Sequence, residues 1–463
     1  MVLKIYNTLS KKKSSFKPIN ENKINLFVCG PTVYDFSHLG HGKTYVQFDV
    51  IVKYLRKFKK FDVFYLQNIT DIDDKIINRA KELGISYIQL SKQFTNYYFE
   101  DMKLLNVDSV SEYARATSFI EEINSQVERL IKKGFAYETN DGVYFEVNKF
   151  KDYGNLSKQP MDKIQRGSRV EINENKKNPE DFVIWKKKKY DDEPSWISKF
   201  SDGRPGWHIE DTAITEKYFG SQYDIHGGGA DLIFPHHEAE IAQMEAISGE
   251  SPLVKYWMHS GFLKINGQKM SKSLNNFFTI RDVLRKYKPQ VLRYFFINSN
   301  YRDPLDFTFE NLDNAKNSLE RINEFIIKLR KYRNAISDNK KFESSLKKYK
   351  LEFEKAMDDD FQTSKALSVI FELVREFNVL LAGASISTND AVKVRKFIDD
   401  FNYIFGIIEP EEKIPDDVMV IVKMREEARA KKDWVASDRF RDQIKKLGYV
   451  LDDTKEGTII KKI

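Results

Sequence analysis

Two short segments carry the residues best suited to chemistry in this chain. His38 and His41 flank Leu-Gly directly after an apolar segment, and Lys269-Met-Ser-Lys-Ser273 places two lysines close together. Histidines at the start of a helix lie where oriented N–H groups already favour anions. Lysines on a closing loop can neutralise the charge that builds on a departing pyrophosphate. Together the segments predict ATP-driven activation of a carboxylate. The expected catalytic residues are His38, His41, Lys269 and Lys272.

The segments around His38 predict the sheet that positions it. Residues 24–29 form an apolar run ended by Gly-Pro, 38–57 carry apolar residues at helical spacing, and 62–69 form a second strand before Thr70. A helix after Asp73 completes a strand-helix-strand-helix pattern, which favours a parallel α/β sheet with right-handed crossovers. Ligands bind at the carboxyl ends of such strands, where Cys29 and Thr70 fall.

The rest of the chain divides into further segments. Residues 113–201 change pattern and include a hairpin around 140–142, so they predict an insertion into the α/β domain. A strand at 223–226, a loop at Gly227–Gly229 and a helix from about Pro235 return to α/β character. Residues 311–405 predict helices, 408–417 a linker, and 418–447 one helix before a glycine-containing tail.

The histidines concentrate near the expected site. All seven lie within 38–41 or 208–259. His236 and Glu240 stand four residues apart on the expected helix, so their side chains share a face and could bind one metal ion, with Cys29 as a third ligand. Taken alone, Cys29 also fits a small buried apolar residue, and the His-Glu pair also fits a helix surface.

Length and composition set outer limits on the protein. The 463 residues, 41% hydrophobic, suit two to four domains. A single cysteine excludes an intramolecular disulfide and fits a reducing compartment. The charge of +7 permits a polyanionic partner without requiring one. No signal-peptide pattern and no apolar stretch near the ~20 residues of a membrane span is found, so we expect a cytoplasmic protein without membrane contact.

Several longer motifs resemble those of cysteinyl-tRNA synthetases, a family of class I aminoacyl-tRNA synthetases. The resemblance extends from Ile5–Leu9 to Trp434–Arg441 and covers nearly the whole chain. Its most specific motifs are Cys29–Asp35, Asn68–Lys75, Gly206–Glu210, His226–Asp231, Phe234–Glu238 and Trp257–Ser260. His38–His41 and Lys269–Ser273 resemble the two signature motifs of the class.

The resemblance implies a Rossmann-like parallel-sheet catalytic domain with an inserted connective subdomain, then an α-helical bundle and a small C-terminal anticodon-binding module. The implied divisions are 1–112 with 202–260 for the catalytic domain, 113–201 for the insertion, 261–310 for a junction subdomain, 311–407 for the bundle, and 408–463 for the linker and module.

The resemblance also assigns site residues. One Zn²⁺ in the amino-acid pocket would be bound by Cys29, Asp211, His236 and Glu240. Asp211 departs from the family, which usually has cysteine there, and the harder ligand set also admits Mn or Fe. Cysteine would contact Cys29, Thr70, Trp207, His226 and Asp231. ATP, entering as a substrate with Mg²⁺, would contact Gly30, Thr32, His38, His41, Gly227, Gly228, Gly229, Lys269, Ser271 and Lys272.

The implied activity is a cysteine–tRNA ligase reaction, in which cysteine is activated with ATP and transferred to the 3′ end of tRNA(Cys), releasing AMP and pyrophosphate. Trp434, Asp438 and Arg439 would contact the anticodon, and the protein is expected to be a monomer. Two alternatives remain at this point: a related ligase that joins activated cysteine to a small amine, and an inactive tRNA-binding relative.

Overall fold

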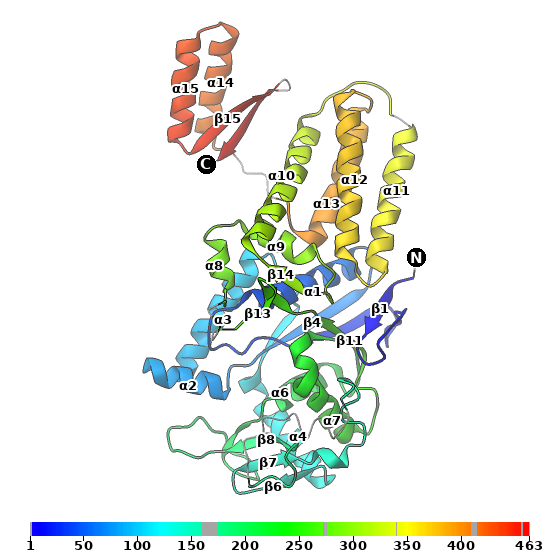
Figure 1. Cartoon of the computed structure of the whole chain (residues 1–463), viewed down its shortest axis with the longest axis vertical. Coiled ribbons are helices and arrows are strands. Elements are labelled where there is room, and N and C mark those ends of the chain that lie inside the picture. Colours follow the sequence, from blue (N-terminus) through cyan, green and yellow to red (C-terminus); the bar gives the residue numbers. More distant parts are fainter. Residues whose placement is uncertain are drawn as a thin grey trace.

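A five-stranded parallel sheet forms the centre of the molecule (Figure 1). The computed structural model describes residues 2–159, 174–271, 274, 276–338, 340–408, 414–454 and 457–462. The strands, in spatial order, are β11 (Val254–Ser260), β10 (Tyr223–Gly229), β3 (Lys23–Val28), β4 (Asp62–Ile69) and β5 (Glu112–Arg115). Every neighbouring pair is parallel, which confirms the predicted sheet type. The order reverses between β3 and β10, so their carboxyl ends border a natural ligand crevice.

Helix α1 (Leu39–Lys57) connects β3 to β4 and is buried along most of its length. Its apolar side chains, including Val46, Phe48 and Val50, belong to the largest hydrophobic cluster of the molecule. His38 caps this helix, because its side chain accepts a hydrogen bond from the His41 N–H at 3.2 Å. The predicted strand at 62–69 and the helix after Asp73 are also present, the latter as α2 (Asp74–Leu83), followed by α3 (Tyr87–Leu104).

The inserted segment folds as a separate antiparallel sheet at one end of the molecule (Figure 1). Its elements are α4 (Ile120–Lys132), β6 (Ala136–Glu138), β7 (Gly142–Phe145), β8 (Phe182–Lys187) and β9 (Gly203–Pro205). The β6–β7 hairpin confirms the turn predicted around 140–142. Apolar residues of α4 and this sheet pack with α6 (Ile209–Phe219) and α7 (Glu238–Ser248) in one cluster. The insertion therefore supports the two helices that carry Asp211 and Glu240.

A small junction and a helical bundle follow the sheet. The junction elements are β12 (Leu263–Ile265), β13 (Gln268–Lys269), α8 (Ile280–Leu284), α9 (Pro289–Ile297) and β14 (Leu305–Phe307), and the bundle helices are α10 (Phe309–Lys331), α11 (Lys340–Asp358), α12 (Thr363–Ala382) and α13 (Thr388–Phe405). Buried Arg293 of α9 pairs with Asp49 of α1 and donates to the carbonyls of Leu105 and Phe405. This one side chain connects α1 and the end of α3 to the bundle helix α13. None of the described helices has the length and apolar composition needed to cross a membrane.

The C-terminal module has its own small core and lies at the opposite end of the molecule from the insertion (Figure 1). It contains α14 (Asp416–Ala430), α15 (Trp434–Lys446), β15 (Tyr449–Thr454) and β16 (Gly457–Lys462). The single helix expected over 418–447 is wrong. Lys432 adopts φ of 58°, outside helical values, and the Asp433 side chain accepts from the Ala436 N–H to begin a second helix.

The glycine run at 227–229 is also different from the sequence expectation, since it continues β10 instead of forming a loop. Gly227, Gly228 and Gly229 pair in register with Met258, His259 and Ser260 of β11. A Cβ at Gly227 would lie 2.4 Å from the Phe48 ring, and one at Gly228 would lie 2.7 Å from the His237 ring. Close packing against the sheet therefore explains these glycines, and loop freedom does not.

Candidate functional site

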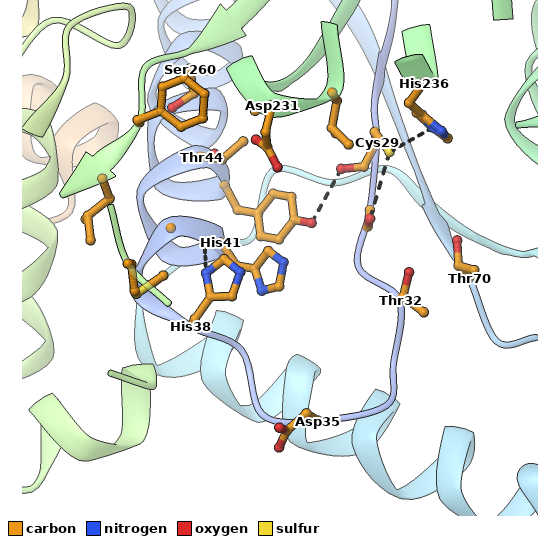
Figure 2. Close-up of a pocket in the computed structure, with 18 of the residues that line it drawn as sticks. Cys29, Thr32, Asp35, His38, His41, Thr44, Thr70, Asp231, His236 and Ser260 are labelled. Atoms are coloured by element: carbon orange, nitrogen blue, oxygen red, sulfur yellow. Dashed lines mark hydrogen bonds between the residues drawn. The ribbon is translucent and has the colours of Figure 1, made fainter. Parts of the chain in front are cut away.

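A cavity of about 380 Å³ opens where β3, β4, β10 and β11 end, at the predicted edge of the sheet (Figure 2). Residues from the ends of these strands, from the start of α1 and from β13 line it. Of the residues proposed from the sequence, the lining includes Cys29, Gly30, Thr32, His38, His41, Thr70, Trp207, Gly229, Asp231, His236 and Lys269. The segments His38–His41 and Lys269–Ser273, more than 200 residues apart in the sequence, therefore both contribute to one cavity.

One end of the cavity is built on the start of α1. The His38 and His41 rings stack with centroids 3.7 Å apart. Burial lowers the pKa of His41 well below its ordinary value, and His38 and Lys75 lower it further. Among the described residues, His41 Nδ1 has no hydrogen-bond partner. The site thus presents a neutral, unpartnered ring nitrogen beside the helix N-terminus, which suits contact with a phosphate group.

The lysine motif contributes Lys269 to the same cavity. Lys269 is exposed and lies in β13, a short strand that pairs with β12 through Lys264. The Ser271 N–H donates to Asn276 Oδ1 at 2.8 Å, although Ser271 does not line the cavity. Lys272 lies outside the described residues. The described part of the motif therefore adds one cationic side chain, Lys269, to the cavity that His38 and His41 also line.

The other end holds four side chains with metal-ligand chemistry. His236 Nε2 lies 2.9 Å from Asp211 Oδ2, 3.2 Å from Glu240 Oε1 and 3.6 Å from Cys29 Sγ. Cys29 Sγ is in turn 3.4 Å from Asp211 Oδ2. All four residues are buried. Cys29 follows β3, Asp211 lies on α6, His236 lies just before α7 and Glu240 lies on α7. The structure groups Asp211, His236 and Glu240 as one candidate metal site, with Cys29 close to His236 and Asp211. His237, which the resemblance did not assign, belongs to two other candidate groups, one with Cys29 and His236 and one with His226 and Glu240.

The charges at this end favour a cation. Burial raises the pKa of the Cys29 thiol well above its usual range, and Asp211 and Glu240 raise it further. Burial likewise raises the pKa of Glu240, and the negative charges of Asp211 and Glu210 raise it further. Neither carboxyl oxygen of Glu240 makes a hydrogen bond to a described residue. A buried carboxyl that has histidine nitrogens near its oxygens, beside a thiol and a second carboxylate, fits a divalent metal ion, which would bind these groups deprotonated.

His208 supports the far side of the His236 ring. The Nδ1 atoms of His208 and His236 are 2.8 Å apart. Burial lowers the pKa of His208 well below its ordinary value, and His236 lowers it further, so the His208 ring is neutral. A neutral His208 can accept the Nδ1 proton of His236 and leave Nε2 of His236 free to face the other three groups.

The proposed cysteine-binding residues lie around the metal end in two layers. Trp207 is 41% exposed at the cavity wall, with its ring 4.8 Å from that of His236, and Asp231 is exposed on the same wall. His226 is fully buried behind the wall, where its Nδ1 lies 2.7 Å from the Tyr223 hydroxyl. Gly227 and Gly228 are also buried in β10 and do not line the cavity.

Two buried polar residues next to the site, Glu210 and Asn68, were not predicted from the sequence. The Thr70 hydroxyl donates to Glu210, and the Asn68 side chain donates to Asp211 Oδ1 at 2.6 Å. Both residues belong to the motifs already noted, Asn68–Lys75 and Gly206–Glu210. A polar residue inside an otherwise apolar strand was the available signal for Asn68.

The proposed anticodon residues lie far from the cavity, on α15 of the C-terminal module (Figure 1). Trp434 begins this helix with 59% of its surface exposed, and Asp438 and Arg439 are exposed along it. An exposed tryptophan beside charged side chains can stack on an unpaired base and hydrogen-bond its edges.

Comparison with known proteins agrees with this architecture. Residues 15–317 match the model of the "tRNA synthetases class I (C) catalytic domain", residues 352–409 the "DALR domain", and residues 411–459 the "Cysteinyl-tRNA ligase anticodon binding domain". Mycobacterium tuberculosis methionyl-tRNA synthetase in complex with methionyl-adenylate shares the fold, with a TM-score of 0.61 and 16% identity over 83% of this chain and 90% of that chain. The fold is that of a class I aminoacyl-tRNA synthetase.

The relatives with curated names narrow this class to one family. The cysteine–tRNA ligase of Thermoplasma volcanium is 48% identical over 98% of this chain and 99% of its own length. That of Thermococcus onnurineus is 45% identical over 100% of both chains. The chain therefore belongs to the cysteine–tRNA ligase family.

Proposed function

We propose that this protein activates L-cysteine with ATP and transfers it to tRNA(Cys), releasing AMP and pyrophosphate. The observation that carries the proposal is the position of the Cys29–Asp211–His236–Glu240 cluster at one end of the cavity whose other end holds His38, His41 and Lys269. One end suits a thiol and the other a polyphosphate, and a single cysteine–ATP pair would span both.

We propose that the cluster binds one Zn²⁺, which supplies a site for the substrate thiolate. A thiolate is a far better zinc ligand than the hydroxyl of serine, so this coordination would discriminate where cavity size could not. Cys29, Asp211, His236 and Glu240 would hold the ion, and His208 would keep His236 in the correct tautomer. Trp207 would wall the side chain, and His226 would support the pocket from behind that wall. Asp231 would receive the substrate ammonium group, and Thr70 would contact the amino acid beside it.

The first step needs no nucleophile from the protein. A carboxylate oxygen of cysteine attacks the α-phosphorus of ATP, and the bond from that phosphorus to the pyrophosphate oxygen breaks. His38 and His41 would hold the phosphates, brought in with Mg²⁺, and Lys269 and Lys272 would offset the charge that develops in the transition state. The remaining nucleotide contacts would come from Gly30, Thr32, Gly229 and Ser271. Gly227 and Gly228 would contribute by allowing β10 to pack closely beneath the nucleotide. Catalysis in this step is positioning and electrostatic stabilisation.

In the second step a terminal ribose hydroxyl of the tRNA attacks the activated carbonyl carbon and AMP departs. Trp434, Asp438 and Arg439 would select the tRNA at its anticodon. The match of residues 411–459 to the anticodon-binding domain supports a tRNA acceptor over a small amine. We place this reaction in the cytoplasm and expect the enzyme to act as a monomer.

Two assays on the purified chain test the proposal. Cysteine-dependent exchange of pyrophosphate into ATP should occur without tRNA, and labelled cysteine should then be attached to tRNA(Cys). Absence of exchange with cysteine would refute the activation step. Exchange without tRNA charging would instead favour a ligase with a different acceptor.

A further inference from the structure

Asn68 connects three parts of the amino-acid end through one side-chain amide. It lies near the end of β4 and is fully buried. Its Nδ2 donates to Asp211 Oδ1 at 2.6 Å and to Thr70 Oγ1 at 3.3 Å. Its Oδ1 accepts the backbone N–H of Gly30, the residue after Cys29. The amide therefore links β4 to Asp211 on α6 and to the backbone of Gly30, the residue after the proposed ligand Cys29.

The contact with Gly30 fixes which way the amide points. A backbone N–H can only donate, so the atom facing Gly30 must be the oxygen and the atom facing Asp211 must be the nitrogen. The two backbones approach very closely here, since a Cβ at Gly30 would lie 1.8 Å from the backbone carbonyl oxygen of Asn68 and 3.0 Å from its side-chain oxygen. The glycine thus permits the approach that orients the amide.

This amide makes the two oxygens of Asp211 unequal. Oδ1 accepts the Asn68 hydrogen bond, while Oδ2 faces Cys29 Sγ at 3.4 Å and His236 Nε2 at 2.9 Å. A carboxylate can bind a metal ion through one oxygen or both, and a hydrogen bond on one oxygen favours binding through the other. We propose that Asn68 is a positioning residue that makes Asp211 a metal ligand through Oδ2 alone. This inference rests on the metal centre proposed above.

An amide suits this task because it donates without adding charge. Cys29, Glu210 and Glu240 already lie near Asp211, as their electrostatic effects on one another show. A lysine or arginine at position 68 would compensate part of the charge that a divalent ion needs, and would compete with that ion. The neutral donor orients Asp211 and leaves the cluster's charge available.

The role should depend on aspartate at position 211. A cysteine ligand has a single sulfur and offers no second oxygen for Asn68 to hold. The loss of the Asn68 amide should therefore weaken metal binding in this chain and have little effect in Asp211→Cys. Because residues in direct contact show coupled effects, a double-mutant cycle isolates this relation.

The test measures release of Zn²⁺ to a chromogenic chelator by four full-length proteins: wild type, Asn68→Ala, Asp211→Cys and the double variant. Gln67→Ala is the matched control, because Gln67 is a buried amide on the same strand that faces the other side and bonds the Tyr98 hydroxyl. If Asn68→Ala does not fold, Asn68→Ser, whose side chain is too short to reach Asp211, replaces it.

We expect Asn68→Ala to release Zn²⁺ about tenfold faster than wild type, as for other groups that orient metal ligands. Gln67→Ala should match wild type, and adding Asn68→Ala to Asp211→Cys should change release by less than about threefold, which is the signature of coupling. The absorption spectrum of the Co²⁺-substituted protein should also weaken in Asn68→Ala, because a second Asp211 oxygen would raise the coordination number.

Other outcomes count against the inference. Equal release from wild type and Asn68→Ala, or an equal loss in both backgrounds, would show that Asn68 does not position Asp211. A wild type that binds no Zn²⁺ and no Co²⁺ would instead overturn the metal centre itself, and the inference with it.

Discussion

The two ends of the cavity are built on different physical principles. At the amino-acid end, Cys29, Asp211, His236 and Glu240 are buried, and His208 and Asn68 hold two of them in fixed orientations. At the phosphate end, Lys269 is exposed on a two-residue strand. Discrimination between cysteine and serine needs desolvated groups in fixed positions, because the two substrates differ only in whether sulfur or oxygen is offered to the metal. Neutralising a triphosphate needs positive charge, which exposed side chains supply when the ligand arrives.

The largest effect is expected from a substitution at the buried end. His236→Ala removes the imidazole that lies between the thiol and the two carboxyl groups. Cysteine-dependent pyrophosphate exchange should fall about 10²- to 10⁴-fold, in line with the roughly 3–5 kcal/mol lost when a buried charged set loses one partner. Bound metal, measured by elemental analysis, should fall with it. A variant that folds and keeps both its metal and its exchange activity would contradict the role given to His236.

Lys269→Ala tests the exposed end. The exchange rate at saturating cysteine should fall about 10²–10³-fold, the usual effect of removing one group that stabilises transition-state charge. Metal content, unfolding temperature and the preference for cysteine over serine should remain at wild-type values, because Lys269 contacts none of the buried cluster. A change in amino-acid preference would mean that the two ends are not separate.

Trp434→Ala should leave both ends of the cavity intact. Charging of tRNA(Cys) should weaken about 5- to 100-fold, through a higher KM for tRNA, since base stacking on an aromatic ring contributes about 1–3 kcal/mol. Pyrophosphate exchange without tRNA should be unchanged. Val435→Ala is a suitable control, because Val435 is 83% exposed on the same turn and offers no ring. Equal effects of the two substitutions would argue against base stacking.

The smallest predicted effect separates the two roles of His38. His38 caps α1 as well as facing the cavity, so His38→Ala should lower the free energy of unfolding by about 1 kcal/mol. His38→Asn keeps a side-chain acceptor at the cap and should retain wild-type stability. Both variants should lose exchange activity if the ring contacts phosphate. Chemical denaturation beside the exchange assay distinguishes the two roles, and full activity in His38→Asn would assign the ring to capping alone.

The sequence predicted the parts of this molecule that local patterns determine. The strand at 62–69 and the helix after His38 follow from spacing within a few residues. The helix expected from about Pro235 begins only at Glu238, so His236 lies just before it, although its Nε2 is still 3.2 Å from Glu240 Oε1. Because Cys29 and Thr70 follow neighbouring parallel strands, they were predicted to lie at one edge of the sheet, and both line the cavity there.

Contacts between distant segments could not be predicted in the same way. Asn68 and Asp211 are 143 residues apart, and nothing local to either residue indicates the hydrogen bond between them. A run of glycines in a sequence resembles a loop. Gly227 and Gly228 lie in a strand because the Phe48 and His237 rings pack against them, and those contacts come from distant segments. The break between α14 and α15 depends on one positive φ at Lys432, a residue type that usually favours helix.

X-ray absorption at the zinc edge tests the central claim most directly, namely that a metal ion at the buried end recognises the substrate thiol. Without substrate the zinc should show one sulfur neighbour at about 2.3 Å, from Cys29, and oxygen or nitrogen neighbours from Asp211, His236 and Glu240. Addition of cysteine should bring a second sulfur to the same distance, and addition of serine should not. A spectrum in which cysteine adds no sulfur neighbour would contradict the account.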